Sequence, residues 1–210
     1  MNKKTPEEYF KEYLVPPGES EEGDYKSSYE IEFIKKFLGG EVPLSQDVKG
    51  QKIATDQVSK DLDIKKLKEV QLVGFCIGNK EISFPIHEVR EVIKKIEYTT
   101  LPSSPPFVVG VINLRNRIIP LLDIMPLLDD DVAQSIEDYR FIVICDYNDF
   151  GIGVFVNKIT TMYKVAQNDI EWNIEAKVGA SGIMKGVFEN KEILIGILDL
   201  EKLVNLILNK

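Results

Sequence analysis

Segment 110–124, which reads GVINLRNRIIPLLDI, most constrains the fold of this chain. Two apolar, β-prone runs, Phe107–Leu114 and Ile118–Leu122, flank a short charged tip at Arg115–Arg117. Strand residues on both sides, with Asn116 able to adopt the left-handed backbone conformation, predict a tight β-hairpin. The chain must therefore place two antiparallel strands side by side.

A weaker copy of this hairpin follows at Gly186–Leu200, which reads GVFENKEILIGILDL. An earlier segment also repeats, because Val73–Val89 aligns with Val143–Ile159, apolar positions opposite apolar positions. Strand pairs recurring in the same order predict two similar β units, and chance similarity between hairpins is the alternative. Two units this small would each be marginally stable, so we expect them to share a buried interface.

Short apolar runs separated by turn residues continue from Val70 almost to the C-terminal end. This spacing favours a small β-barrel or β-sandwich over an alternating βαβ sheet. An amphipathic helix is predicted over Asp199–Leu208. The predicted strands are Val70–Ile77, Glu81–Pro85, Val108–Leu114, Arg117–Asp123, Tyr139–Cys145, Gly151–Val156, Ile159–Lys164, Gly186–Phe188 and Ile193–Leu198.

The first part of the chain has a different composition, and we divide the sequence into an N-terminal extension, 1–65, and a β domain, 66–210. Segment 15–29 is rich in Pro, Gly, Ser and acidic residues, which is typical of a solvated linker, and 41–65 also reads as a polar linker. Residues 6–14 could form a short helix. The extension is therefore expected to be partly helical.

Residues 29–38, YEIEFIKKFL, predict one short amphipathic helix that ends at Gly39-Gly40. A helix this short is marginal unless it packs on another surface. That surface is either the core of this chain or a groove on a partner.

The net charge of −8 disfavours a nucleic-acid binder, which would show a basic patch or stripe. The N-terminal segment MNKKTPEEYF contains two lysines with no apolar stretch behind them, so it does not read as a signal peptide. No apolar run approaches the roughly 18 residues that span a bilayer. The expected compartment is the cytoplasm, with no insertion into the membrane.

The two cysteines, Cys76 and Cys145, lie singly in apolar runs and read as buried core residues. A thiol nucleophile needs a nearby histidine and an orienting group, and His87 is the only histidine. Three Cys and His residues without a close pair also make a poor zinc site. We therefore expect no metal and no cofactor.

The segment INLRNRIIPLLDI resembles the INLRG-x-I-x-P-x-x-D-L hallmark of CheW-like domains, the adaptor family of bacterial chemotaxis. The resemblance covers about residues 68–208 and implies a mainly β fold: two intertwined five-stranded SH3-like β-barrels with a C-terminal helix. Further segments that resemble family motifs, in the same order, are Phe75–Gly78, Ile86–Val92, Leu101–Gly110, Gly153–Ile159 and Ile195–Leu203.

The resemblance also implies a function: a non-enzymatic scaffold that couples chemoreceptors to a histidine kinase at cytoplasmic receptor arrays. The implied partners are the regulatory domain of the kinase CheA and the cytoplasmic tips of methyl-accepting chemoreceptors, with no nucleic acid. The implied receptor-binding residues are Val89, Glu91, Gly110, Arg115, Ile159 and Met162. The implied kinase-binding region surrounds Ile82 and Ile86.

Each of these residues also has a structural interpretation. Apolar strand residues such as Val89, Ile159 and Met162 are usually core, and a charge such as Arg115 is usually solvated. An arginine at a hairpin tip can nevertheless form bidentate pairs with carboxylates or amides on a receptor helix.

Three positions depart from the family pattern. Asn116 replaces the hallmark glycine, Asn157 replaces the usual aspartate, and 184–187 lacks a common Gly-Leu-Gly. With the N-terminal extension, they bear on receptor choice more than on the fold. A second hypothesis keeps the fold but changes the role: a specialised adaptor whose N-terminal helix recruits another partner or masks a binding face. A carboxylate hydrolase is the third, but no acidic pair lies in a recognisable constellation with a nucleophile or base.

Overall fold

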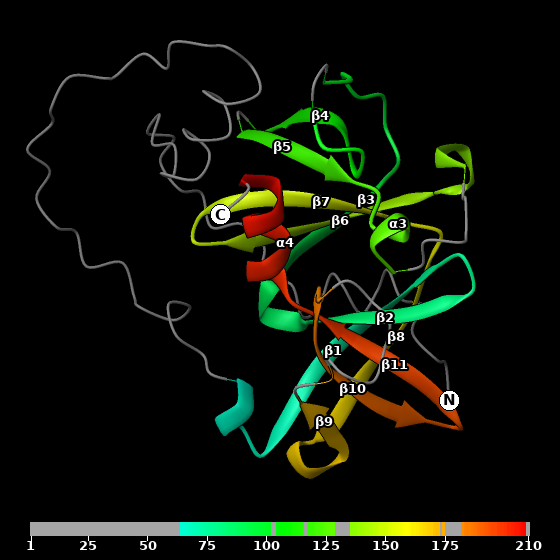
Figure 1. The fold of residues 1–210 in the computed structure, drawn as a ribbon, viewed down its shortest axis with the longest axis vertical. Coiled ribbons are helices and arrows are strands. Elements are labelled where there is room, and N and C mark those ends of the chain that lie inside the picture. Colours follow the sequence, from blue (N-terminus) through cyan, green and yellow to red (C-terminus); the bar gives the residue numbers. More distant parts are fainter. Residues whose placement is uncertain are drawn as a thin grey trace, which may run out of the picture.

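The computed structural model describes residues 64–101, 104–115, 117–128, 135–172, 174 and 182–208, which are mostly β (Figure 1). The helices predicted over 6–14 and 29–38, and the hallmark position Asn116, lie outside the described residues. The division into an extension and a β domain stays a prediction.

One sheet, which we call the first barrel, has six strands in the order β8-β1-β2-β11-β10-β9. All its neighbouring strands are antiparallel except β2 and β11. Its strands are β1 (Glu69–Ile77), β2 (Lys80–Pro85), β8 (Lys158–Ala166), β9 (Ile170–Trp172), β10 (Met184–Asn190) and β11 (Ile193–Leu198).

The other sheet, the second barrel, has five strands in the order β3-β6-β7-β5-β4. Here β5 and β7 are the parallel pair. Its strands are β3 (Val89–Lys94), β4 (Val108–Leu114), β5 (Arg117–Leu122), β6 (Phe141–Tyr147) and β7 (Phe150–Val156).

The two barrels exchange strands between the sequence repeats. Strands β1 to β5 correspond in order to β6, β7, β8, β10 and β11, so, apart from β9, each sheet combines a hairpin from one repeat with three strands from the other. Even the register repeats, since Ser83 faces Ile197 across one parallel pair and Gly153 faces Leu121 across the other. The predicted pair of similar, intertwined β units is confirmed.

The sixth strand of the first barrel, β9, has an equivalent in the second barrel. In each barrel a short extended segment pairs with the outer strand of the second hairpin. In the second barrel, Thr99 forms an isolated bridge with Val111 of β4. In the equivalent place of the first barrel, Glu171 of β9 faces Val187 of β10. The predicted fold class of two SH3-like barrels is therefore confirmed, with β9 as a longer version of the Thr99 bridge.

The helices are short. The C-terminal helix α4 begins directly after Asp199, whose side chain accepts a hydrogen bond from the Lys202 amide at 3.2 Å, and this confirms the predicted closing helix. The helices are η2 (Ile64–Lys66), η3 (Ile86–Glu88), α3 (Met125–Leu128), η4 (Ile136–Asp138), η5 (Gln167–Asp169) and α4 (Leu200–Leu208).

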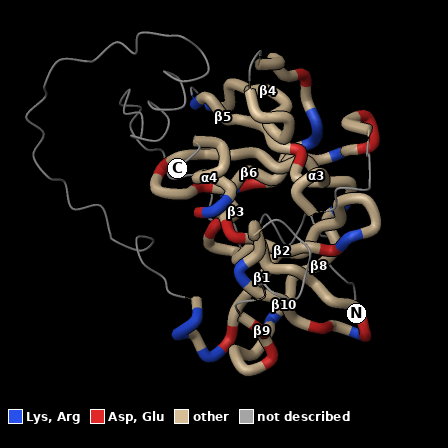
Figure 2. The backbone as a smooth tube through the Cα atoms, viewed as in Figure 1, with Lys and Arg blue, Asp and Glu red and all other residues tan. Residues whose placement is uncertain are grey.

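One large core crosses both barrels. It includes Phe75 and Phe84 of the first barrel, Phe155 of the second, and Leu203 of α4, all fully buried. A smaller core fills the first barrel alone, around Leu72, Phe188 and Ile195. Charged residues lie mainly in loops and at strand ends, as Figure 2 shows. The shared buried interface expected from the repeat is therefore present.

Candidate partner-binding surface

The tip of the β4–β5 hairpin presents Arg115. Leu114 faces Arg117 across the hairpin, and Arg115 adopts the left-handed backbone conformation with φ of 51°. Its side chain is 55% exposed, and its Nη2 lies 3.1 Å from Oε2 of Glu91 on β3. The structure thus brings together two of the receptor-binding residues that the resemblance implied, although they lie far apart in sequence.

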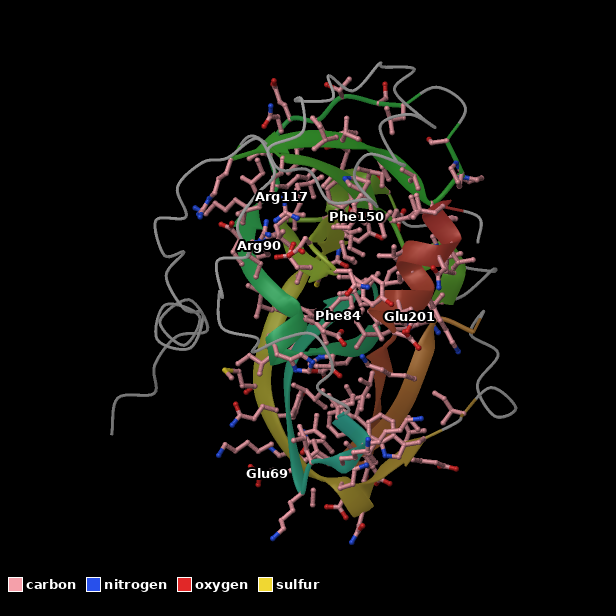
Figure 3. All side chains as sticks on the ribbon, turned by 90° about the vertical axis from the view of Figure 1, so that its left-hand side faces the viewer. Glu69, Phe84, Arg90, Arg117, Phe150 and Glu201 are labelled. Atoms are coloured by element: carbon pink, nitrogen blue, oxygen red, sulfur yellow. The ribbon has the colours of Figure 1, made fainter. Side chains whose placement is uncertain are left out.

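A second ion-pair group adjoins this tip. Arg90 Nε lies 2.5 Å from Oδ2 of Asp146, and Arg117 Nη2 lies 3.4 Å from Oδ1 of the same carboxylate. Arg117 also donates a hydrogen bond to the carbonyl of Asp149. Arg90 and Arg117 lie on the same side of the second barrel in Figure 3. Asp146 therefore holds two guanidinium groups in place.

Burial raises the pKa of Asp146 to about 6, although the Arg117 guanidinium acts in the opposite direction. Gly151 leaves room for this arrangement, since a Cβ there would lie 3.3 Å from Asp146 Oδ1. We call Arg90, Glu91, Arg115, Arg117 and Asp146 the charged mouth of the second barrel. With three guanidinium groups and two carboxylates, it suits a partner that presents carboxylate or amide oxygens.

Gly110 supports the hairpin through its backbone. The β4–β5 register shifts between Val108 and Gly110, and a Cβ at Gly110 would collide with the Thr99 carbonyl oxygen. Gly186 occupies the same bulge in the first barrel, where a Cβ would lie 2.9 Å from the Trp172 ring. Gly110 therefore allows the barrel to close, and a partner contact is not needed to explain it.

The apolar receptor-binding candidates are placed differently from the charged ones. Val89 is 4% exposed and belongs to the shared core. Ile159 and Met162 are half-buried on the edge strand β8 of the first barrel, where they face Phe75 and Val73 of β1. Ile159 also packs against the shared core. Of these three side chains, Ile159 and Met162 retain a surface that a partner could touch.

The kinase-binding candidates lie at and after β2. Ile82 is 1% exposed and Ile86 is half-buried against the shared core. The exposed apolar residues nearby are on the adjacent strand, β11, where Ile193 is 53% and Leu194 is 65% exposed. Gly196 of β11 faces Ile82 directly. Sequence reasoning missed Ile193 and Leu194, although they are the most exposed of the large hydrophobic residues that the structure describes.

The repeat explains why the two barrel mouths differ. In the alignment of the two halves, Ile193 stands where the second barrel has Arg117, Cys76 where it has Asp146, and Thr160 where it has Arg90. The ion-pair group of one barrel is thus replaced by uncharged side chains in the other. We call the exposed pair Ile193 and Leu194 the apolar mouth of the first barrel. The alignment of the repeats could have revealed this difference.

A largely buried ion pair joins the two halves of the domain, and sequence reasoning also missed it. Glu88, at the end of η3, lies 2.5 Å from Nζ of Lys185 on β10, and the two side chains are 16% and 17% exposed. Burial raises the pKa of Glu88, while the Lys185 charge and hydrogen bond lower it. Burial and Lys185 both lower the pKa of the neighbouring His87.

Asn157, which replaces the usual family aspartate, has a structural role. Its Oδ1 accepts a hydrogen bond from the Gly78 amide at 2.7 Å, and its Nδ2 donates to the Asp138 carbonyl at 3.0 Å. An aspartate could not make the second bond, because an ionised carboxylate has no donor. The asparagine thus ties the β1–β2 turn to η4.

Two absences apply only to the part of the chain that the structure describes. It contains no group of three or more His, Cys, Asp or Glu side chains placed to hold a metal ion. None of its helices is long and apolar enough to cross a membrane.

Comparison with known proteins agrees with this architecture. The chain is 30% identical over 135 residues to the chemotaxis protein CheW of Helicobacter pylori, which covers 64% of this chain and 81% of that protein. It is 29% identical over 139 residues to CheW of Thermotoga maritima, covering 66% and 89%. The crystal structure of the scaffolding protein TtCheW from Thermoanaerobacter tengcongensis superposes with a TM-score of 0.56 at 25% identity, covering 62% and 89%. Residues 71–207 match the CheW-like domain, and the chain belongs to that family.

Proposed function

We propose that this protein is a chemotaxis scaffold that couples methyl-accepting chemoreceptors to the regulatory domain of the histidine kinase CheA. It would act in the cytoplasm at receptor arrays, without catalytic turnover of its own. Membership of the CheW-like family and the names of its relatives, a chemotaxis protein and a scaffolding protein, support this role.

The observation that carries the receptor half of the proposal is the state of Arg115. Its side chain is 55% exposed at a tight turn, yet Glu91 restrains it from β3. A restrained arginine loses less side-chain entropy when a partner binds, and arginine is enriched among residues that dominate interface energies. The charged mouth therefore offers a preorganised contact for an oxygen-bearing side chain of a receptor helix.

Arg115→Glu should weaken binding of a receptor cytoplasmic fragment by about tenfold or more, since an interface arginine commonly contributes over about 1 kcal/mol. The free energy of unfolding should change by about 0.5–1 kcal/mol, because Arg115 is exposed and its ion pair is at the surface. Titration calorimetry with the receptor fragment and urea unfolding measure the two quantities.

The charge-swapped variant Arg115→Glu with Glu91→Arg is the matched control. It keeps an ion pair at the tip, so stability should return while receptor affinity stays low. If the swap restores affinity as well, the pair serves the fold of the hairpin and Arg115 is not the receptor contact.

For binding to the kinase domain, the apolar mouth is more exposed than the candidates Ile82 and Ile86. The family resemblance implies that the kinase domain pairs through apolar patches at strand ends, and Ile193 and Leu194 are the exposed apolar residues, one on each face, at such an end of the strand beside Ile82. Ile82 would then support the surface from beneath, and Ile86 would lie near its border.

Leu194→Glu should weaken binding of the CheA regulatory domain by about tenfold or more and leave receptor binding unchanged, because it places a charge in an apolar contact. Ile96→Glu is the control, since Ile96 is 44% exposed but lies between β3 and the Thr99 bridge. Wild-type protein that binds neither kinase domain nor receptor fragment would overturn the proposed function.

A further inference from the structure

We propose that segment 29–38 of this same chain docks on the apolar mouth of the first barrel and competes there with the kinase domain. The docking itself depends only on the chain, whereas the competition rests on the proposed function.

The surface exposes apolar side chains at two positions where its counterpart does not. Ile193 continues the face of Ile195 and Ile197, which are fully buried in the first-barrel core, outwards to the strand end. Leu194 lies on the opposite face of the same strand. In the second barrel the equivalent positions are Arg117, which is ion-paired to Asp146, and Ile118, which packs against the shared core. The first barrel alone thus leaves both positions more than half exposed.

The proposed occupant has complementary chemistry. The sequence of segment 29–38 predicts an amphipathic helix, which is too short to be stable unless its apolar face packs on another surface. It precedes the family match, which begins at residue 71. It is therefore an addition to the domain, with no packing role already assigned to it. Its apolar residues are Tyr29, Ile31, Phe33, Ile34, Phe37 and Leu38.

The chain between segment 29–38 and Ile64 is long enough to reach from the start of β1 to the apolar mouth. The described chain begins at Ile64, which is 7% exposed, and Lys65 lies 5.6 Å from the Trp172 ring centroid of β9. That end of the first barrel is the start of β1, at the lower left of Figure 1, and the β10–β11 tip lies at the lower right. The pairing of β1 with β2, and of β2 with β11, also places the start of β11 toward the far end of β1, and a nine-residue strand is about 25–30 Å long.

Residues 39–63 separate the segment from Ile64, and a flexible polar chain of about 25 residues has a root-mean-square span of roughly 25–30 Å. The effective concentration of a tethered ligand is highest when the span of its linker matches the separation of the sites, and reaches the millimolar range. A contact too weak to hold a free peptide can therefore be occupied within one chain.

A second copy of the chain is the weaker alternative. A stable interface buries about 800 Å² on each partner, which two exposed side chains at a hairpin tip do not approach. A tethered segment avoids this requirement because it does not lose translational freedom again on binding.

The direct test places a photo-reactive benzoylphenylalanine at position 194 of the full-length chain. On irradiation it should cross-link to residues 29–38 of the same molecule, with a yield independent of protein concentration. Benzoylphenylalanine at position 96 is the control and should give no cross-link to this segment. A cross-link that forms between two molecules, or the absence of a cross-link to residues 29–38, would overturn the docking.

Phe37→Glu in the full-length chain tests the consequence. It should abolish the cross-link from position 194 and raise the affinity for the CheA regulatory domain by about three- to tenfold, since the site is no longer occupied. Unchanged affinity, when Leu194→Glu still weakens kinase binding, would contradict the competition. If the kinase domain does not bind at all, the proposed function fails, while the cross-link still decides whether the segment docks.

Discussion

Replacing Lys185 with methionine should lower the free energy of unfolding by about 3–5 kcal/mol at neutral pH. Lys185 is the cation 2.5 Å from the carboxylate of Glu88, and both side chains are less than one-fifth exposed. The variant keeps most of the aliphatic volume but leaves Glu88 as an unpaired, nearly buried charge. The loss should therefore greatly exceed that of an ordinary surface ion pair.

The loss should shrink as the pH falls. Burial already raises the pKa of Glu88 in the folded protein, and removing the Lys185 charge would raise it further. A folded-state pKa above the unfolded value, about 4.3, means that the folded state binds the proton more tightly. Acidification through the folded-state pKa therefore stabilises the variant relative to the wild type.

Urea unfolding of both proteins at neutral pH and at mildly acidic pH measures this difference. Lys164→Met is the matched control, because Lys164 pairs with Glu69 at 3.6 Å with both side chains more than half exposed. It should cost less than about 1 kcal/mol at either pH. A loss at Lys185 that does not change with pH would mean that packing, and not the Glu88 charge, is responsible.

Much of the fold could be predicted because the repeat and the alternation of apolar residues encode it locally. Most predicted strands agree with the structure to within a few residues, and Gly186–Phe188 is the core of the longer β10. Strands β3 and β9 were not predicted. In β3, with the sequence VREVIK, charged residues break up the apolar pattern. The alignment of the repeats would have placed β3, because it maps Ile159–Lys164 onto Val89–Lys94.

The candidate surface was less predictable, because it depends on contacts between distant residues. The resemblance implied roles for Glu91 and Arg115, but their ion pair follows from the packing of β3 beside the β4–β5 hairpin. The Glu88–Lys185 pair joins the two halves of the domain. Exposure is equally non-local, since Ile82 and Leu194 are both aliphatic strand residues, yet one is buried and the other is not. Sequence patterns identify such residues but do not say which way they face.

The aspartate of the hallmark segment shows the same limit. Asp123 is 8% exposed and accepts two hydrogen bonds: from the amide of Met125, the first residue of α3, at 3.0 Å, and from the Tyr139 hydroxyl at 2.6 Å. Burial, with this hydrogen bond and the Asp123 charge, raises the pKa of Tyr139. Tyr139 also stacks on Phe155, with ring centroids 5.6 Å apart. Asp123 thus joins the end of β5 to the shared core.

Asp123→Ala should lower the free energy of unfolding by about 3 kcal/mol, as the sum of a lost buried hydrogen bond to the first amide of α3 and a buried tyrosine hydroxyl left without its acceptor. The repeat supplies the matched control in Asp199, which caps α4 through the Lys202 amide but is only half-buried. Asp199→Ala should cost only about 1 kcal/mol. Tyr139→Phe in the Asp123→Ala background should recover part of the loss, because it removes the unpaired hydroxyl. Equal losses at Asp123 and Asp199, measured by urea unfolding, would show that the hydrogen bond to the start of the helix alone explains the hallmark aspartate.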